Sequence, residues 1–512
     1  MYDFPFRNAV VIDGSGKQGF CADVAVAEKR ICLIDEDLSY VRASRTFDAS
    51  SFFLTPGFID IHSHTDSLCF LSPQMNEKAN QGITLDVAGN CGAGFFPNTE
   101  ESLPVLKEYV KDIIRSDWEI PFDDYSSLKA ELKRRGCGIN MSFLCSHTAI
   151  RTAVMGKDSK REASEEEIEK MCALLEKELE NGACGFSTGL YYSPVIFSSR
   201  DELKALLNTA GRKGKLFSVH LRSEGNDFLS SLDEILSLAL EASVKTEISH
   251  FKVIGEKNQN KLCSALSLIE KYREKGLCVS FDQYPYTYGS TSLFSLLPPS
   301  VLRLSPLEIR IALSLDIQRR DIKEEMLAGT TYESIYSLVG PEKIKIKLLE
   351  NNPQYENMSL SEIASERNED ALDALLDILA EETGCAIMED ETESEENLIA
   401  IMKHPLMSFG SDSLFSVNEK SDHERSRSAV PHFLSFCVKE KGILSLAEAV
   451  ARLSGRNADK LSLSERGYVR EGYYADLVLL SRDTLSPDTV LVNGKLKKDK
   501  GVLQNSLPGM VI

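Results

Sequence analysis

Residue types that bind metals or transfer protons recur in this chain at the ends of short apolar runs. His62 and His64 lie one residue apart at the end of GFIDIHSH, so a strand would place both imidazoles on the same face. Four more such residues end or nearly end other apolar runs, and these are Cys91, His220, His250 and Asp412. Thiolate and imidazole suit zinc, and a neighbouring carboxylate can act as a base. Each residue alone has an ordinary structural interpretation, so the prediction of a metal site depends on their occurring together.

The apolar runs that carry these residues predict eight barrel strands. They are residues 57–64, 84–91, 140–147, 182–189, 216–223, 245–252, 277–286 and 406–413. Helical segments lie between several of them, one of which begins with a capping-box pattern at Ser199 and Glu202. Catalytic residues of a (β/α)8 barrel lie at the C-terminal ends of its strands, where these polar side chains fall. The sequence therefore predicts an α/β protein with a (β/α)8 TIM-type barrel.

The two ends of the chain differ from the barrel pattern. Residues 1–54 and 440–512 contain short strands with Gly, Asp and Asn turns, and we expect them to form one small β-sandwich domain beside a barrel of residues 55–439. The connection between strands 7 and 8, residues 299–404, is far longer than a usual βα loop. We expect a helical insertion there, with the acidic run 388–397 as a solvated loop and helix start rather than a partner-binding tail.

Charge and composition limit the class of partner. The formal net charge is −20 and no long Lys/Arg run occurs, so nucleic acid and membrane are not expected partners and a small-molecule substrate is favoured. No secretory signal is recognised at the start of the sequence, and no apolar run reaches the roughly 18 residues of a membrane-spanning helix. The 12 cysteines lack a framework spacing and suit reduced thiols. We therefore expect a cytoplasmic protein.

Together the motifs resemble the amidohydrolase superfamily, and within it the N-acyl-D-amino-acid deacylases (D-aminoacylase family). The segments that carry the resemblance are PGFIDIHSHTD, GNCG, SVHLRSEG, ISHFKVIG, DQYPYTYGST, FGSDS and RGYVREGYYADLVLL. Many superfamily members bind metal through a carbamylated lysine at the fourth strand, where this chain reads GACGFSTGLYY and has no lysine. In the deacylases a thiolate at the second strand replaces it. The resemblance covers essentially the whole chain.

The resemblance implies a role for each candidate residue. Cys91, His220 and His250 would hold one tight Zn²⁺, while His62 and His64 would form a second, weaker divalent site that shares Cys91. Asp412 would be the catalytic base, taking a proton from water and returning it to the leaving amine. The implied substrate-binding residues are Lys252, Tyr284, Arg425, Tyr192 and His147.

Three of the substrate-binding assignments have alternatives. Lys252, Tyr284 and Arg425 would bind the substrate carboxylate, but Arg425 lies in HERSRS, where relatives often have HPRxxG, so Arg427 is its alternative. His147 could instead orient a ligand or pack at the barrel rim. Tyr192 could line the pocket or only pack.

The predicted function is zinc-dependent hydrolysis of the amide bond of N-acyl-D-amino acids to a carboxylate and a free D-amino acid. The D configuration follows from the resemblance alone. Neutral or apolar side chains are favoured, because GSTSLFSLLPPS after YPYT has no arginine for an acidic one. One alternative is a cyclic-amide hydrolase of the hydantoinase or dihydroorotase kind, against which the missing fourth-strand lysine argues. Another is a non-catalytic binding or assembly protein on the same fold, against which the complete ligand set argues.

Overall fold

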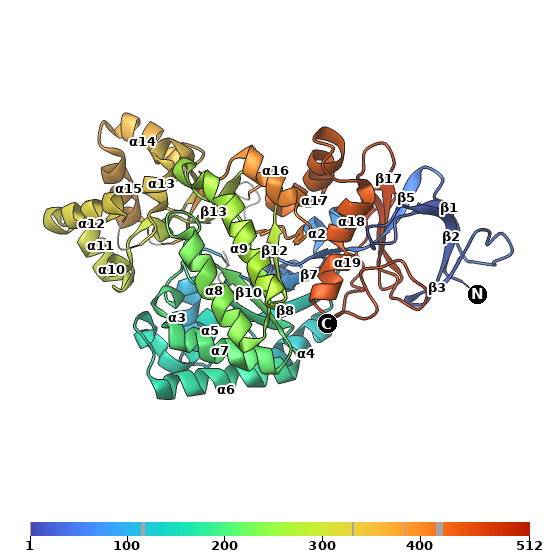
Figure 1. The fold of residues 1–512 in the computed structure, drawn as a ribbon, viewed down its shortest axis with the longest axis horizontal. Coiled ribbons are helices and arrows are strands. Elements are labelled where there is room, and N and C mark those ends of the chain that lie inside the picture. Colours follow the sequence, from blue (N-terminus) through green and yellow to red (C-terminus); the bar gives the residue numbers. More distant parts are fainter. Residues whose placement is uncertain (1, 114–117, 330–331, 383, 416–422) are drawn as a thin grey trace.

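The protein consists of a central barrel, a β-sheet at one end and an insertion at the other (Figure 1). The computed structural model describes residues 2–113, 118–329, 332–382, 384–415 and 423–512. Both chain ends contribute strands to the terminal sheet, whereas the insertion lies beyond the opposite side of the barrel (Figure 1). The insertion and the terminal sheet therefore border different sides of the barrel.

Within the described residues, the barrel has eight strands, one in each predicted run, and all neighbouring pairs are parallel. They are β6 (Phe58–Asp60), β7 (Ile83–Ala88), β8 (Asn140–Ser146), β9 (Gly185–Gly189), β10 (Leu216–His220), β11 (Lys245–Ile248), β12 (Val279–Gln283) and β16 (Met407–Phe409). A parallel bridge between Ser63 and Ser413 joins the first and last strands. The predicted barrel is confirmed.

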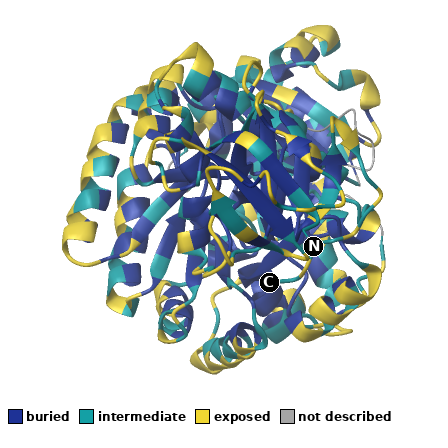
Figure 2. Cartoon of the chain, turned by 90° about the vertical axis from the view of Figure 1, so that its right-hand side faces the viewer, coloured by how far each residue is buried: buried dark blue, intermediate teal, exposed yellow. Residues whose placement is uncertain are grey.

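Helices cover the outside of the barrel and bury one face each against it. The principal ones are α3 (Leu103–Val110), α4 (Tyr125–Arg135), α5 (His147–Met155), α6 (Glu165–Asn181), α7 (Arg200–Arg212), α8 (Phe228–Ala242) and α9 (Leu262–Glu274). Ser199 caps α7 by accepting from the backbone N–H of Glu202. The carboxylate of Glu202 does not complete the expected capping box, because it turns inward to His147 and Arg151. Figure 2 shows the resulting pattern, with buried strands inside and exposed outer helix faces.

Strands from both chain ends form one mixed sheet, separate from the barrel, as predicted. Its described strands run in the order β20-β19-β18-β17-β5-β1-β2-β3, with β4 paired to β1. Their bounds are β1 (Phe4–Val11), β2 (Phe20–Ala27), β3 (Arg30–Asp35), β4 (Phe47–Asp48), β5 (Phe52–Pro56), β17 (Leu477–Ser481), β18 (Pro487–Val492), β19 (Lys495–Asp499) and β20 (Val502–Leu503). Phe6, Val24 and Leu54 pack with Leu477 and Leu491 in its core.

The insertion between β12 and β16 contains helices, as predicted, and also a small antiparallel sheet. The sheet order is β13 (Tyr288–Ser292), β15 (Ala386–Glu391) and β14 (Ile344–Leu349). The helices are α10 (Pro299–Leu302), α11 (Pro306–Ser314), α12 (Asp316–Ala328), α13 (Ile335–Val339), α14 (Leu360–Arg367), α15 (Ala371–Glu381) and α16 (Glu395–Lys403). Leu293, Leu313, Leu375 and Met388 belong to an apolar core of the insertion itself.

The acidic run 388–397 is not the solvated loop that its charge suggested. Its first residues belong to β15, the central strand of the small sheet, and Asp390 is buried. Only the end of the run, from Glu395, begins a helix, as expected. The expectation was wrong for the first part because it lies in the central strand of the sheet, where Asp390 is buried and only Glu391 is exposed.

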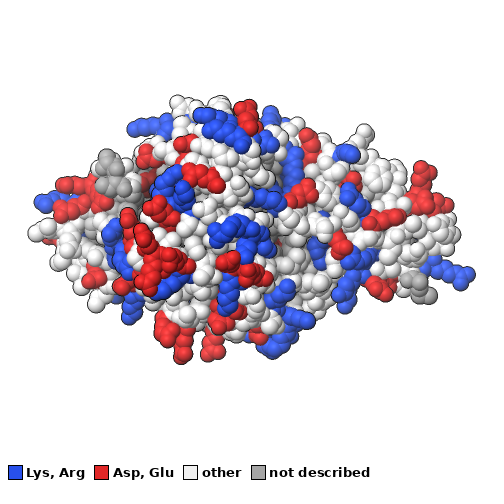
Figure 3. All heavy atoms as spheres, turned by 60° about the horizontal axis from the view of Figure 1, so that its bottom comes forward, with Lys and Arg blue, Asp and Glu red and all other residues white. Residues whose placement is uncertain are grey.

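The surface carries both signs of charge. Figure 3 shows acidic and basic side chains intermixed over the face in view. In the described parts of the chain, no helix is long and apolar enough to cross a membrane.

Candidate metal centre and substrate pocket

Imidazole and thiol groups converge at the C-terminal mouth of the barrel. The Sγ atom of Cys91 lies 3.3 Å from Nε2 of His62 and 3.5 Å from Nε2 of His250. Nε2 of His250 lies 2.9 Å from Nδ1 of His220. The ring of His64 reaches the same group through Asp412, whose Oδ1 is 3.1 Å from its Nε2. All five predicted metal ligands are thus buried together beside the predicted base.

The backbone is strained at three of these six residues. Cys91, His250 and Asp412 have φ values of 52°, 34° and 50°, in the left-handed region that non-glycine residues rarely adopt. Each follows the end of a barrel strand, β7, β11 or β16 respectively. Strain of this kind persists where the surrounding structure enforces it, and it clusters at functional sites. We interpret it as the conformation that turns these side chains into the mouth.

Two buried carboxylates that the sequence analysis did not single out orient the histidines. Asp282, on β12, accepts from Nδ1 of His62 at 3.0 Å and from the backbone N–H of His250 at 2.9 Å. Glu224, beyond β10, accepts from Nδ1 of His250 at 3.1 Å. Carboxylates that bind the second ring nitrogen fix the tautomer of a metal-binding histidine. Asp282 lies in the DQYPYT segment and Glu224 in the HLRSEG segment, so a carboxylate within each of these motifs was the signal that could have found them.

The charges of the cluster favour the metal-binding form of the thiol. Burial would raise the pKa of Cys91, but His62 and His250 outweigh it and hold that pKa well below its usual range. Burial would also raise the pKa of Asp412, which Arg425 and His64 instead hold well below its usual value. Glu224 is held at a pKa of about 2, since Lys252, His220 and His250 outweigh the effect of its burial. Burial would lower the pKa of His62 and His250, but Asp282 and Cys91 hold that of His62 well above its usual range, and Glu224 and Cys91 raise that of His250 to about 9. The thiolate and carboxylates thus face imidazolium rings, whose protons a bound metal ion would displace.

These donors fit a zinc site. Three overlapping sets each place one ligand atom per residue within 4.8 Å of the others, and these are His62, Cys91 and His250; His62, His64 and Asp412; and His220, Glu224 and His250. Nδ1 of His64 is buried without a hydrogen-bond partner among the described residues. A thiolate with several imidazoles is a donor set that suits Zn²⁺.

A buried lysine, Lys78, connects the first two barrel strands to the segment that follows the last one. Nζ of Lys78 lies 2.6 Å from Oδ2 of Asp60 on β6 and 3.0 Å from Oδ1 of Asp86 on β7. It also donates to Oγ of Ser413 at 2.6 Å, one residue beyond Asp412. Lys78 belongs to α2 (Asn76–Asn80) and was not predicted as a site residue. The contacts tie the first two strands to the segment that carries the predicted base.

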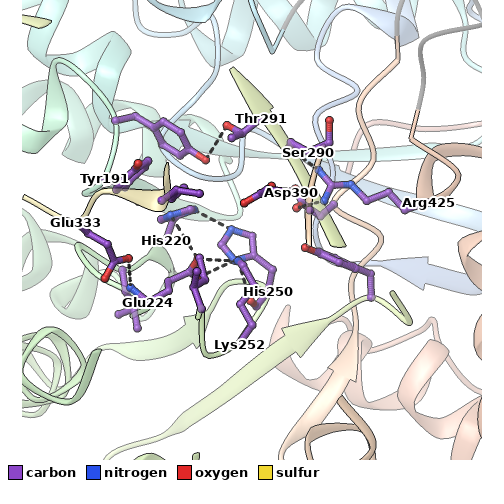
Figure 4. Close-up of a pocket in the computed structure, with 17 residues that line it drawn as sticks. Tyr191, His220, Glu224, His250, Lys252, Ser290, Thr291, Glu333, Asp390 and Arg425 are labelled. Atoms are coloured by element: carbon purple, nitrogen blue, oxygen red, sulfur yellow. Dashed lines mark hydrogen bonds and ion pairs between the residues drawn. The ribbon is translucent and has the colours of Figure 1, made fainter. Parts of the chain in front are cut away.

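The metal-ligand cluster opens onto a pocket whose polar side carries three predicted carboxylate-binding residues, Lys252, Tyr284 and Arg425 (Figure 4). Arg425, at the start of α17 (Arg425–Leu434), pairs with Oδ2 of Asp412 at 2.9 Å and lies 4.8 Å above the ring of Tyr284. Lys252 pairs with Glu224 at 2.7 Å. Arg427 instead lies near Glu77 and outside the pocket, so the geometry favours Arg425 of the two arginines.

The insertion supplies part of the pocket that the sequence analysis missed. Ser290 and Thr291 come from β13, Ile335 from α13 and Asp390 from β15. The backbone carbonyl of Ser290 accepts from Arg425 at 3.1 Å. Burial raises the pKa of Asp390 to about 6, although Lys252 and Arg425 oppose the shift. Ser290 and Thr291 end the DQYPYTYGST segment, but the sequence analysis gave them no role. No local motif marks Ile335 or Asp390, which only the folding of the insertion brings to the barrel mouth.

Tyr192 lines the pocket, as predicted. Its ring packs edge-on against His220 with 4.9 Å between centroids, and its hydroxyl lies 3.1 Å from Oγ1 of Thr291. Tyr192 is therefore fixed between a predicted zinc ligand and the insertion.

His147 does not reach the pocket. Its Nδ1 lies 2.8 Å from Oγ1 of Thr188, and its Nε2 lies 2.8 Å from Oε1 of Glu202 on α7. Glu202 also pairs with Arg151. His147 opens α5 and not a strand end, so its side chain turns toward the surrounding helices. The structure thus favours the packing alternative over substrate binding.

Comparison with known proteins identifies the class of this chain. Residues 45–295 match the amidohydrolase family. D-aminoacylase of Alcaligenes xylosoxydans xylosoxydans is 28% identical over 501 residues, which are 98% of this chain and 92% of the relative. N-acyl-D-glutamate deacylase of the same organism is 30% identical over 488 residues, or 94% and 88% of the two chains.

Solved structures agree with these relatives. N-acyl-D-glutamate deacylase from Bordetella bronchiseptica, complexed with zinc and a phosphonate inhibitor that mimics the tetrahedral intermediate, gives a TM-score of 0.83 at 28% identity and covers 100% of this chain and 99% of that one. A D-aminoacylase with a binuclear metal centre gives 0.82 at 27% identity, with coverage of 100% and 99%. The chain therefore belongs to the amidohydrolase family. Its full-length relatives within that family are D-aminoacylases and N-acyl-D-amino-acid deacylases.

Proposed function

We propose that this protein is a zinc-dependent deacylase that cleaves the amide bond of N-acyl-D-amino acids to a carboxylate and a free D-amino acid. The observation that carries the proposal is one buried pocket in which Asp412 contacts both the metal-ligand cluster, through His64, and a carboxylate-binding arginine, Arg425. An N-acyl amino acid places its scissile amide and its carboxylate within a few bonds of each other. The pocket offers groups for both.

The chemistry begins with the metal ligands. Cys91, His220 and His250 would hold the tight zinc, and His62 and His64 would hold a second, weaker divalent ion that shares Cys91. When bound, zinc polarises the scissile carbonyl and lowers the pKa of water from about 15.7 toward 7. Nδ1 of His62 binds Asp282 and Nδ1 of His250 binds Glu224, so Nε2 of each ring would be the atom that binds a metal ion.

Asp412 would transfer the protons. Its carboxylate lies 3.1 Å from Nε2 of His64 and 3.4 Å from Nε2 of His62, so it stands directly beside the proposed metal ligands. The ionised carboxylate can accept a proton from the attacking water and then donate it to the leaving amine nitrogen. One residue can thus serve both steps.

The polar side of the pocket would bind the substrate carboxylate. Arg425 offers a bidentate fork, Lys252 a point charge and Tyr284 a hydroxyl. On substrate binding the guanidinium of Arg425 would exchange its contact with Asp412 for the substrate carboxylate. Substrate binding would thus free the carboxylate of Asp412 from its ion pair with Arg425, so that Asp412 can act as the base.

The opposite side of the pocket favours a neutral or apolar amino-acid side chain. Tyr191, Ile254 and Ile335 line it, and Glu333 is the charged group among them. An acidic substrate side chain would meet the carboxylate of Glu333 there. The D configuration is proposed because the full-length relatives are named for D-amino-acid substrates.

The cyclic-amide alternative receives no comparable support. Hydantoinases share the fold, but L-hydantoinase from Arthrobacter aurescens is only 16% identical with a TM-score of 0.57. Strand β9, where a carbamylated lysine would stand, reads GFSTG.

Release of free amine from paired N-acetyl-D- and N-acetyl-L-amino acids tests the proposal. Zinc content and turnover would be measured on the same sample with the Met, Leu and Glu derivatives. We expect turnover of D-Met and D-Leu substrates, slower turnover of D-Glu and none of the L forms. Bound zinc without turnover of either enantiomer, as the N-acetyl or as a longer N-acyl derivative, would contradict the proposal, and cleavage of hydantoins by the same sample would establish the cyclic-amide alternative.

A further inference from the structure

A second, larger cavity adjoins the proposed catalytic pocket. It measures about 820 Å³ and lies between the barrel side and the insertion. Val105 and Tyr109 of α3 line one wall, and Phe294, Leu302, Leu304 and Ile309 line the other. Cavities of roughly 300–1,000 Å³ are the usual size for small-molecule sites. None of the steps proposed above uses this space.

The two cavities meet at Tyr191, Tyr192 and Thr291, which line both. The ring of Tyr192 packs against His220, so the second cavity begins beside a proposed zinc ligand. Arg425 contacts β13 one residue before Thr291, where it donates to the backbone carbonyl of Ser290 at 3.1 Å (Figure 4). Because Tyr192 packs against His220, an acyl group whose carbonyl lies at the metal ligands would begin beside this junction.

The lining of the second cavity suits an apolar ligand, because several of its polar groups already have partners. Nζ of Lys160 donates to the carbonyl of Leu304 at 2.6 Å, and the hydroxyl of Tyr191 donates to the carbonyl of Ser295 at 2.9 Å. Nε of Arg310 donates to the carbonyl of Ala380 at 3.1 Å. Leu307, on the cavity lining, is 67% exposed. Apolar side chains thus line the cavity from the junction at Tyr192 to the exposed Leu307, together with charged groups such as Glu108, Lys111 and Arg303.

We propose that this cavity holds the acyl chain of the substrate, and that the substrates are N-acyl-D-amino acids with medium or long aliphatic acyl groups. The inference rests on the proposed deacylase function and specifies its substrate class. An acetyl group would leave the cavity empty, whereas a chain of eight or more carbons would pass Tyr192 and replace water on the lining. Each added methylene would then increase kcat/KM up to about fourfold, the factor that corresponds to ~0.8 kcal/mol per buried methylene.

A chain-length series tests the occupant. N-acetyl, N-butanoyl, N-hexanoyl, N-octanoyl and N-decanoyl derivatives of one D-amino acid would be compared by kcat/KM. We expect a steady rise totalling at least 100-fold from acetyl to decanoyl. A constant or falling series, with the acetyl derivative still cleaved, would overturn the inference and leave the deacylase function intact.

Two substitutions on opposite walls would fill the cavity. Val105→Trp acts from α3 and Leu302→Trp from α10, and Leu315→Trp is a matched control at a 49% exposed position that does not line the cavity. We expect both cavity variants to lose at least tenfold on the decanoyl substrate and to stay within twofold of wild type on the acetyl one. The control should match wild type on both. Equal losses on both substrates would overturn the inference.

The same variants determine which part of the substrate enters the cavity. N-acetyl-D-amino acids with side chains from Ala to Trp would be measured in parallel. If Val105→Trp and Leu302→Trp discriminate by side-chain size and not by acyl length, the cavity holds the side chain and the assignment is wrong.

Equilibrium binding separates failure of the inference from failure of the proposed function. Calorimetry would measure the binding of N-decanoyl-D-leucine to the Asp412→Asn variant. The same measurement would then be made on two double variants, in which Asp412→Asn is combined with Val105→Trp or with Leu302→Trp. If no derivative in the series is cleaved, the deacylase function fails. Binding weakened at least tenfold by each cavity substitution would still support an acyl site, and binding unchanged by both would exclude it.

Discussion

The two walls of the catalytic pocket are built differently. The barrel wall places its groups at strand ends, where carboxylates such as Asp282 and Glu224 fix them. The insertion wall adds residues from a small sheet, among them Thr291 and Asp390. The barrel wall carries the groups proposed for bond cleavage, and the insertion wall bounds the space around the substrate. Under the proposed function, the groups for bond cleavage thus come from the barrel, and part of the boundary around the substrate comes from the insertion.

The largest expected effect is on the barrel wall. Asp412→Asn should lower kcat by about 10⁴-fold, the upper end for an acid–base group, because one carboxylate would serve both proton transfers. Zinc content should remain at the wild-type level, since the proposed tight-site ligands are unchanged. Turnover and zinc content measured on the same preparation check this. Activity near the wild-type level would show that Asp412 is not the base.

The support beneath the barrel wall should matter to stability. Lys78→Met would leave the buried carboxylates of Asp60 and Asp86 without their cation and should cost about 3–5 kcal/mol of the free energy of unfolding. Urea denaturation measures the change. Lys170→Met is the matched control, because its ion pair with Glu166 is exposed and should contribute at most about 1 kcal/mol. Equal effects of the two substitutions would show that the buried contacts do not support the mouth.

Arg425 joins the two walls, through Asp412 on one side and the carbonyl of Ser290 on the other. Arg425→Met should raise KM by about 10- to 100-fold, the range for loss of hydrogen bonds from a charged group, with a smaller change in kcat. Arg427→Met is the control and should leave KM within about twofold of wild type. Steady-state kinetics with an N-acyl-D-amino acid distinguish the two. A larger effect at Arg427 would reverse the assignment.

A buried carboxylate outside the pocket, Glu178, has a raised pKa, whereas that of Asp412 is lowered. Glu178, on α6, accepts from the backbone N–H of Tyr125, and burial raises its pKa to about 7. Its usual pKa is 4.5, so between these values the folded protein keeps a proton that the unfolded chain has lost. Its contribution to stability is therefore present at low pH and decreases as the pH rises from about 4.5 to about 7.

Glu178→Gln removes this titration. The stability of the variant relative to wild type should increase across that pH interval and stay constant above it. Urea denaturation at several pH values, with both proteins measured in parallel, gives the difference. A difference that does not change with pH would show that Glu178 titrates normally in the folded protein.

Much of the barrel wall could be predicted because its signals are local. Each strand appears as an apolar run ending in a polar group, and His62, Cys91 and Asp412 lie within a few residues of such ends. The resemblance then supplied roles for these residues. His147 shows the limit of the pattern. Strand β8 ends at Ser146, so His147, the next residue, begins helix α5 instead of ending the strand.

The insertion wall could not be predicted from local patterns. Asp390 lies in an acidic run that is typical of solvent-exposed segments, but it is buried in the folded insertion, where β15 is the central strand of the small sheet. Lys78 likewise has no motif, and its role depends on three barrel strands meeting around it. Contacts between segments far apart in sequence determine both.

The most direct test of the central claim is zinc reconstitution of the metal-free protein while hydrolysis of an N-acyl-D-amino acid is followed. We expect no turnover without metal, and activity that rises in proportion to the first equivalent of zinc and is absent in a Cys91→Ala variant at the same zinc concentration. Full hydrolysis by the metal-free protein, or full activity of Cys91→Ala, would contradict the proposed metal centre.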